Sequence, residues 1–328
     1  MTISRLIPNN FALAKRFLTG VNPRTIFDLT KRNLSTDMFQ ESSDGPIVPS
    51  TIYLDSSYMC NRRCDGCYVA NDSTIMPMEL AESVCETGYK IGVAYIFWMG
   101  GEPFLANTKD LVLDVTSNFP NVTFSFCSNG DFIDEKIADK IANMPHISAV
   151  ISLDGLERLN DQRRGNGAFK NATNAISLLH ERKVLCGYSS TLLPGNWEEV
   201  TSKNFVESMI EIGSIFGTYT SKLCNGDGNI QLSTDQYNES IIRLTELSLE
   251  MPIYLFSTNI GYLGRNAFEN GLKRLVGISI SPKGVVKTNR NSENGKVIGK
   301  DGSLEEIIFS DEVQEIFRQK LNGTNECE

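Results

Sequence analysis

The stretch 51-TIYLDSSYMCNRRCDGC-67 joins a strand-like segment to a loop with three cysteines. Its first half, 51–57, is rich in β-branched and aromatic residues, as β-strands are. Its second half, 60–67, spaces the three thiols as C-x-x-x-C-x-x-C. A strand that ends in a loop of metal-binding residues is typical of α/β folds, in which the loops after strands carry the chemistry.

Strand-like and helix-like segments alternate downstream of this stretch. Further strands are predicted at 94–99, 122–128, 147–154, 184–193, 214–222 and 252–257. Helical patterns lie between them, near 77–91, 107–118, 133–143, 168–182, 200–212 and 234–250. This alternation favours βα units arranged as a parallel sheet or barrel.

Composition is that of an ordinary globular protein and excludes several classes. The 328 residues carry a net charge of −9, which argues against general nucleic-acid binding. No apolar run has the length of a membrane span, and the start lacks the pattern of a secretory signal, so a cytoplasmic location is expected. Cysteines outside the triplet occur singly, unlike a disulfide framework: Cys85, Cys127, Cys186, Cys224 and Cys327.

Three regions are predicted: a helical extension at 1–50, the βα core at 51–257 and a small α+β extension at 258–328. Residues 1–33 are basic and amphipathic, with Arg5, Lys15, Arg16, Arg24, Lys31 and Arg32 against Asp28. This start has two interpretations, a peripheral contact with an anionic membrane or lipid, or a helix packed on the core with its charges in water.

The three clustered cysteines indicate a metal centre. Thiolates bind iron–sulfur clusters, zinc and copper(I). Three of them would hold three irons of a four-iron cubane and leave the fourth iron open to a ligand. The alternative is a structural zinc site completed by a distant residue, but the only histidines, His146 and His180, lie in a helix-to-strand turn and a helical run.

Four motifs in order resemble those of the radical S-adenosylmethionine (SAM) superfamily. The triplet resembles its cluster motif, and 100-GGEP-103, 128-SNG-130 and 152-SLDG-155 follow, each after a predicted strand. Within the superfamily the chain resembles the SPASM and twitch branch, with a degenerate C-terminal region. This resemblance implies a partial (β/α)6 TIM-like barrel with the helical and α+β extensions named above.

The resemblance also implies the ligands. Cys60, Cys64 and Cys67 would hold one 4Fe-4S cluster. SAM would be contacted by Gly100, Gly101, Glu102, Pro103, Ser128, Asn129, Ser152, Asp154 and either Arg163 or Arg164. Among these, Glu102 and the backbone beside it would receive the amino group of SAM. Ser152 and one arginine would hold its carboxylate and ribose.

The activity that the resemblance implies is radical chemistry. An electron from a ferredoxin- or flavodoxin-like donor would cleave SAM to a 5′-deoxyadenosyl radical, which would take hydrogen from a substrate. Relatives often carry an auxiliary cluster in a C-terminal G-x-V-x-P-C hairpin. The matching positions here are Gly284, Val286, Thr288 and Asn289, so a single cluster is expected.

Three functions remain open from the sequence. We expect a small-molecule or lipid-like substrate, because the basic start, the missing auxiliary cysteines and the lack of an added peptide-recognition domain favour it. The alternatives are a peptide-modifying maturase and a non-catalytic barrel with structural zinc. Cys224, after the strand at 214–222, is a candidate hydrogen donor to a product radical, or else a small buried side chain.

Overall fold

The computed structural model describes residues 11–27, 45–67, 69, 72–221, 232–257, 261–262, 276–289 and 295–322. The strands are β1 (Thr51–Ser57), β2 (Tyr95–Gly100), β3 (Phe124–Ser128), β4 (Ile147–Ser152), β5 (Leu185–Leu192), β6 (Phe216–Ser221), β7 (Tyr254–Ser257), β8 (Gly261–Tyr262), β9 (Gly277–Ile280), β10 (Val285–Lys287) and β11 (Lys296–Val297). The helices are α2 (Phe11–Gly20), α4 (Met78–Ile91), α5 (Lys109–Asn118), α6 (Glu135–Ala142), α7 (Glu157–Arg164), α8 (Ala168–Glu181), α9 (Trp197–Val200), α10 (Lys203–Glu211), α11 (Thr234–Glu250), α13 (Leu304–Ile308) and α14 (Asp311–Asn322).

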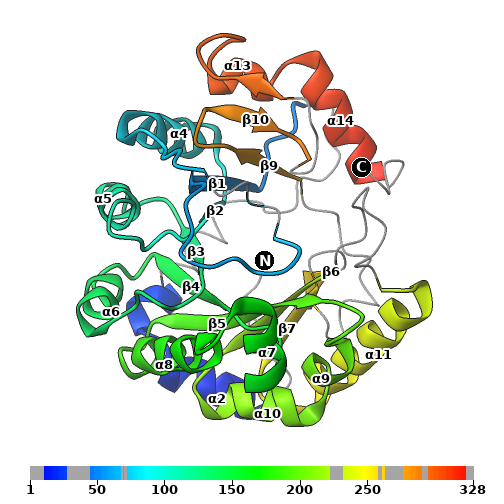
Figure 1. The fold of residues 1–328 in the computed structure, drawn as a ribbon. Helices are drawn as coiled ribbons and strands as arrows, with labels where there is room; N and C mark the ends of the chain where they lie inside the picture. The colour runs from blue at the N-terminus through cyan, green and yellow to red at the C-terminus, as the bar shows by residue number, and fades with distance from the viewer. Residues whose placement is uncertain are drawn as a thin grey trace.

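The described strands form one curved sheet in the order β11-β10-β9-β1-β2-β3-β4-β5-β6-β7-β8. Strands β1 to β7 run parallel to one another, β9 joins the other side of β1, also in parallel, and β8 is antiparallel to β7. Figure 1 shows the strands curving around the centre of the molecule with the helices outside them. The predicted α/β fold and partial barrel are confirmed, and the parallel run extends beyond six strands.

One face of the sheet packs against the helices, and together they form the hydrophobic core. On β1, Ile52 and Leu54 are fully buried. Helix α4 presents Ala81, Val84 and Cys85 to the core, at the spacing of one helical face. A Cβ atom at Gly88, one turn further along α4, would lie 3.4 Å from Cδ1 of Ile52, so helix and sheet are closely packed.

The opposite face of the sheet lines the inside of the barrel. Tyr53 of β1 pairs with Phe97 of β2, which pairs with Ser125 of β3, which pairs with Ser148 of β4. The rings of Tyr53 and Phe97 lie 6.0 Å apart, and the hydroxyl oxygens of Ser125 and Ser148 are 2.5 Å apart. The inner face therefore changes from aromatic at β1 and β2 to hydroxyl-bearing at β3 and β4.

Helix α2 packs across the amino ends of the strands, beside α10 (Figure 1). Leu13 is buried, and the guanidinium of Arg16 donates to the carbonyls of Ile210 at 3.1 Å, Ser214 at 2.9 Å and Pro252 at 2.5 Å. Burial lowers the pKa of Arg16. The expectation that the charges of a packed helix would lie in water is therefore wrong for Arg16.

The membrane contact predicted for residues 1–33 stays a prediction. On the described part of this segment, Leu18 and Phe27 are 62% and 64% exposed. None of the helices in the described part of the chain combines the length and the apolar run needed to cross a bilayer.

Candidate functional site

The three cysteines lie on the loop that follows β1. Cys60 and Cys64 are half-buried, Cys67 is exposed, and none of the three forms a disulfide with another cysteine that the structure describes. The backbone N–H of Cys67 donates to the carbonyl of Cys64 at 3.1 Å, which closes a turn around Gly66. The backbone N–H of Arg62 donates to Sγ of Cys60 at 3.4 Å. Such N–H donors stabilise the negative charge of a metal-bound thiolate, so the donor set fits an iron–sulfur cluster.

The 100–103 loop lies directly against the chain that leads into the cysteines. Backbone N–H groups of Gly101 and Glu102 donate to the carbonyls of Ser57 and Met59, both at 2.7 Å. A Cβ atom at Gly101 would lie 1.7 Å from the carbonyl oxygen of Met59. Only glycine permits this approach, so the 100–103 motif is held by backbone contacts against the segment that leads into the cysteine motif.

The side chain of Glu102 points into the protein and joins the loops after β2 and β3. Its Oε1 accepts from Ser128 Oγ at 2.8 Å and from the N–H of Phe104 at 3.0 Å. Its Oε2 accepts from the N–H of Asn129 at 2.8 Å. The carboxylate thus braces two loops, a role that sequence reasoning missed. Its expected contact with the amino group of SAM stays a prediction.

Burial raises the pKa of Glu102 to about 7, against an ordinary 4.5. Between pH 4.5 and about pH 7, the folded protein therefore keeps the proton of Glu102, which the unfolded chain has already lost. The free energy of unfolding is expected to fall by up to about 3 kcal/mol as the pH rises from about 5 to about 8. Urea unfolding of the wild type and of Glu102→Gln, which cannot ionise, measures this. Equal pH dependence in both would contradict the prediction.

Asn129 faces the cysteine loop. Its Nδ2 donates to Oδ1 of Asn61 at 2.8 Å, and its Oδ1 accepts from the N–H of Asp131 at 2.9 Å. Ser152, at the end of β4, lies with its Oγ 3.5 Å from Sγ of Cys127 on β3. The predicted residues of the loops after β1, β2, β3 and β4 therefore gather at one end of the sheet.

Asp154 is a buried hub after β4. Its Oδ2 accepts from Arg163 and, at 2.5 Å, from Nε of Arg164, while its Oδ1 accepts from the N–H of Thr191 at 2.7 Å. Burial alone would raise the pKa of Asp154, but the guanidinium groups of Arg164 and Arg163 outweigh it and hold the pKa below its usual value. Asp154 is thus placed to position both candidate arginines.

The choice between the two arginines stays open, with an observation for each. Burial opposes the charge of Arg164, but the carboxylate of Asp154 outweighs it and raises the pKa of Arg164. Arg163 instead carries a buried Nε that has no hydrogen-bond partner among the described residues. Cys224, the candidate hydrogen donor, lies outside the described residues.

Sequence reasoning also missed Arg62 and Asp131. Arg62 donates from Nε to Oδ2 of Asp131 at 2.6 Å and from Nη2 to Oδ1 at 2.5 Å. The two side chains are only 10% and 9% exposed. The available signal was their opposite charge beside two motifs. Arg62 lies inside the cysteine triplet, and Asp131 directly follows the 128–130 motif.

The structural zinc alternative requires a fourth ligand that converges with the three cysteines on one point. Among the residues that the structure describes, no three His, Cys, Asp or Glu side chains are grouped as ligands of one metal ion. Zinc needs its ligands to converge on one point, whereas each cysteine of a cubane binds a different iron. His146 instead shares a hydrogen bond with the carbonyl of Thr116 at 2.8 Å.

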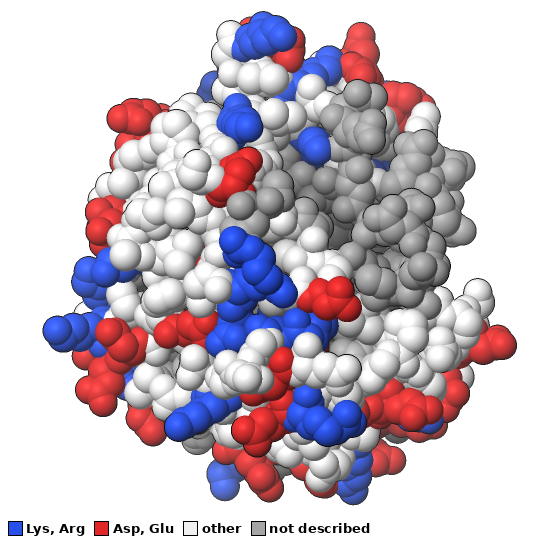
Figure 2. Space-filling view, viewed as in Figure 1, with Lys and Arg blue, Asp and Glu red and all other residues white. Residues whose placement is uncertain are grey.

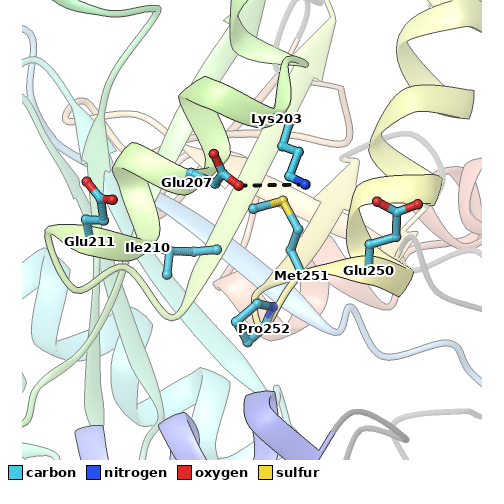
Figure 3. A pocket seen from close by; sticks show the side chains of 7 residues that line it. All are labelled: Lys203, Glu207, Ile210, Glu211, Glu250, Met251 and Pro252. Carbon is cyan, nitrogen blue, oxygen red and sulfur yellow. Dashed lines mark ion pairs between the residues drawn. The ribbon is translucent and has the colours of Figure 1, made fainter.

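A hollow of about 360 Å³ lies elsewhere and is not part of this site. Its lining residues are Lys203, Glu207, Ile210, Glu211, Glu250, Met251 and Pro252 (Figure 3). They belong to α10, to the end of α11 and to the turn before β7, which places the hollow at the amino ends of the strands. On the face seen in Figure 2, lysine and arginine side chains gather near the centre, where Figure 1 shows α7.

Comparison with known proteins adds relatives for about half of the chain. The family "Radical SAM superfamily" matches residues 55–202. The sporulation killing factor maturation protein SkfB of Bacillus subtilis is 32% identical over 161 residues, which are 47% of this chain and 38% of SkfB. The mycofactocin maturase MftC of Mycolicibacterium smegmatis is 30% identical over 149 residues, 44% of this chain and 36% of MftC. The match thus spans less than half the length of either curated relative.

Solved structures match over more of the chain. SuiB of Streptococcus suis bound to precursor peptide SuiA has a TM-score of 0.65 at 16% identity, over 90% of this chain and 70% of SuiB. The enzyme anSMEcpe with bound AdoMet and the Cp18Cys peptide has a TM-score of 0.62 at 17% identity, over 83% of each chain. At these identities the likeness establishes the fold.

Proposed function

Residues 55–202 belong to the radical SAM superfamily, and from this premise we propose that the chain is a radical SAM enzyme that modifies a precursor peptide. The observation that carries the proposal is the placement of three cysteines on one loop whose backbone is hydrogen-bonded to the 100–103 loop. When bound, the 4Fe-4S cluster and SAM supply a 5′-deoxyadenosyl radical that takes hydrogen from a C–H bond.

The chain's own residues position these groups. Cys60, Cys64 and Cys67 would hold the cluster at the carboxyl end of β1. The backbone of 100–103 and the side chains of Asn129 and Ser152 would line the SAM side, while Glu102 fixes the distance between their loops. Alternate residues of β1 to β4, which line the inside of the barrel, would meet the substrate.

A peptide substrate has better support than the small molecule or lipid favoured by the sequence. SkfB and MftC, both at least 30% identical over the matched part, are named as maturation proteins, and SuiB was solved with a precursor peptide. A small-molecule substrate is the second candidate. It is supported by the Fe-coproporphyrin III synthase of Methanosarcina barkeri, which is 25% identical over 175 residues.

Anaerobic reconstitution with iron and sulfide tests the class. The protein is expected to turn brown, to absorb broadly at about 400 nm and to form 5′-deoxyadenosine from SAM after reduction with dithionite. A colourless protein that holds zinc and forms none would contradict the proposal. The substrate class is tested by co-expression with the peptides encoded beside its gene. A peptide mass change supports a maturase, and 5′-deoxyadenosine without any such change favours the second candidate.

Cys64→Ala is expected to abolish both the absorbance and the formation of 5′-deoxyadenosine, because a cluster ligand is lost. Cys85→Ala is the matched control, since Cys85 is buried in α4 on the outer face of the sheet. This variant should keep both properties. Iron content and 5′-deoxyadenosine formation are measured for both variants. Equal values in Cys64→Ala and Cys85→Ala would refute the assignment of Cys64 as a cluster ligand.

Two partners are proposed with less support. A ferredoxin- or flavodoxin-like donor would be acidic and would approach the face on which basic side chains gather (Figure 2). A peripheral membrane contact would use the exposed Leu18 and Phe27 near the amino ends of the strands. Both partners fit a cytoplasmic enzyme.

A further inference from the structure

An ion pair from inside the cysteine triplet ties the cysteine loop to three other segments. The carboxylate of Asp131 holds both Nε and Nη2 of Arg62. The same carboxylate accepts from Nδ2 of Asn61 at 2.5 Å and from Nδ2 of Asn171, on α8, at 2.8 Å. One partly buried carboxylate therefore binds two residues of the loop and the first turn of a helix.

The third nitrogen of Arg62 reaches the end of α7. Its Nη1 donates to the carbonyls of Arg164 at 3.0 Å and Gly165 at 3.3 Å. These carbonyls lie at the negative end of the helix dipole, which favours a cation. The N–H of Asp65 adds a backbone bond to the carbonyl of Arg163 at 3.1 Å. The loop is thus tied twice to the helix that carries both candidate arginines.

We propose that the Arg62–Asp131 pair is a positioning device that holds the cysteine loop in the shape required to bind the cluster and tunes the cluster's potential. This inference rests on the proposed function. The guanidinium fixes the side chain of Arg62, and the backbone N–H of the same residue donates to Sγ of Cys60. Releasing the side chain therefore also releases a donor to a cluster ligand.

The positioning role depends on the bidentate geometry of the ion pair between Arg62 and Asp131. Both oxygens of Asp131 are used by Arg62, and only arginine presents two parallel donors of this kind. Arg62→Lys keeps the charge and loses the fork. The double variant Arg62→Gln/Asp131→Asn removes both charges at once, so neither charge is left buried alone.

The test uses full-length protein reconstituted anaerobically with iron and sulfide. Wild type, Arg62→Lys and Arg62→Gln/Asp131→Asn are compared for iron per chain, rate of iron loss to a chelator and reduction potential. Circular dichroism establishes that each is folded at the temperature used. Asp139→Asn is the control, because Asp139 forms an exposed ion pair with Arg182, which joins α6 to the end of α8.

Both Arg62 variants are expected to lose iron about 10-fold faster than the wild type, the usual effect of removing a residue that supports a metal ligand. Their potential is expected to be lower, because a donor to sulfur is lost. Iron loss and potential equal to those of the wild type and control would overturn this inference alone. A wild type that binds no cluster would overturn the proposed function as well.

Discussion

Gly101→Ala is expected to give a protein that neither folds stably nor holds iron. A Cβ atom at this position would lie 1.7 Å from the carbonyl oxygen of Met59 and 2.4 Å from its carbonyl carbon. These are backbone atoms, so no side chain can rotate away to make room. The loss of unfolding free energy is expected to be about 3 kcal/mol or more, at the upper end for overpacking. Urea denaturation with and without reconstitution measures it.

The matched control for this substitution is Gly195→Ala. A Cβ atom at Gly195 would have no heavy atom within 4 Å, and its backbone is not left-handed. This variant should stay within about 1 kcal/mol of the wild type. If Gly101→Ala matched it in stability and iron content, the close backbone contact of the two loops would not be needed.

Asp154→Ala is expected to cost about 3–5 kcal/mol, the usual effect of removing one partner from a buried ion pair. Two guanidinium groups would lose their counter-charge, because Arg163 and Arg164 both pair with this fully buried carboxylate. The N–H of Thr191 would also lose its acceptor. Thermal and urea unfolding at neutral pH check the size of the effect.

Two comparisons separate this hub from an ordinary acidic residue. Asp139→Ala removes an exposed carboxylate that pairs with Arg182, and it should change stability little. Asp154→Ala/Arg163→Leu removes one of the two stranded charges and should recover part of the loss. A cost of Asp154→Ala no larger than that of Asp139→Ala would show that the hub contributes little.

Local patterns were sufficient for much of the fold. Each strand from β1 to β7 was predicted close to its observed bounds, because β-branched and aromatic residues mark buried strands. The hairpin of β9 and β10 lies where Gly284 and Val286 match the C-terminal hairpin of the resembled family, with Gly284 at φ 73° in its turn. Helix α7 was missed because its sequence, ERLNDQRR, has no apolar periodicity. It is held by polar contacts, among them those of Arg163 and Arg164 with Asp154.

The four motifs predicted where the site lies, but they did not predict which of its residues are hydrogen-bonded to one another. The order of the four motifs predicted that they would meet at the strand ends. The burial of Glu102 against Ser128 was not predictable, because a lone carboxylate is expected at the surface. The pairing of Arg62 with Asp131 joins residues far apart in the sequence, so no local pattern records it. The same holds for the parallel pairing of β9 with β1.

That last pairing has a consequence for how the protein matures in the cell. Strand β1 carries the cysteine loop, yet one of its two neighbours is β9, in which Gly277 pairs with Thr51 and which is synthesised long after β1. Contacts between such distant segments close late in folding. Strand β1 is therefore expected to keep an open edge until β9 is available, and stable insertion of iron into the cysteine loop is expected only after β9 has left the ribosome.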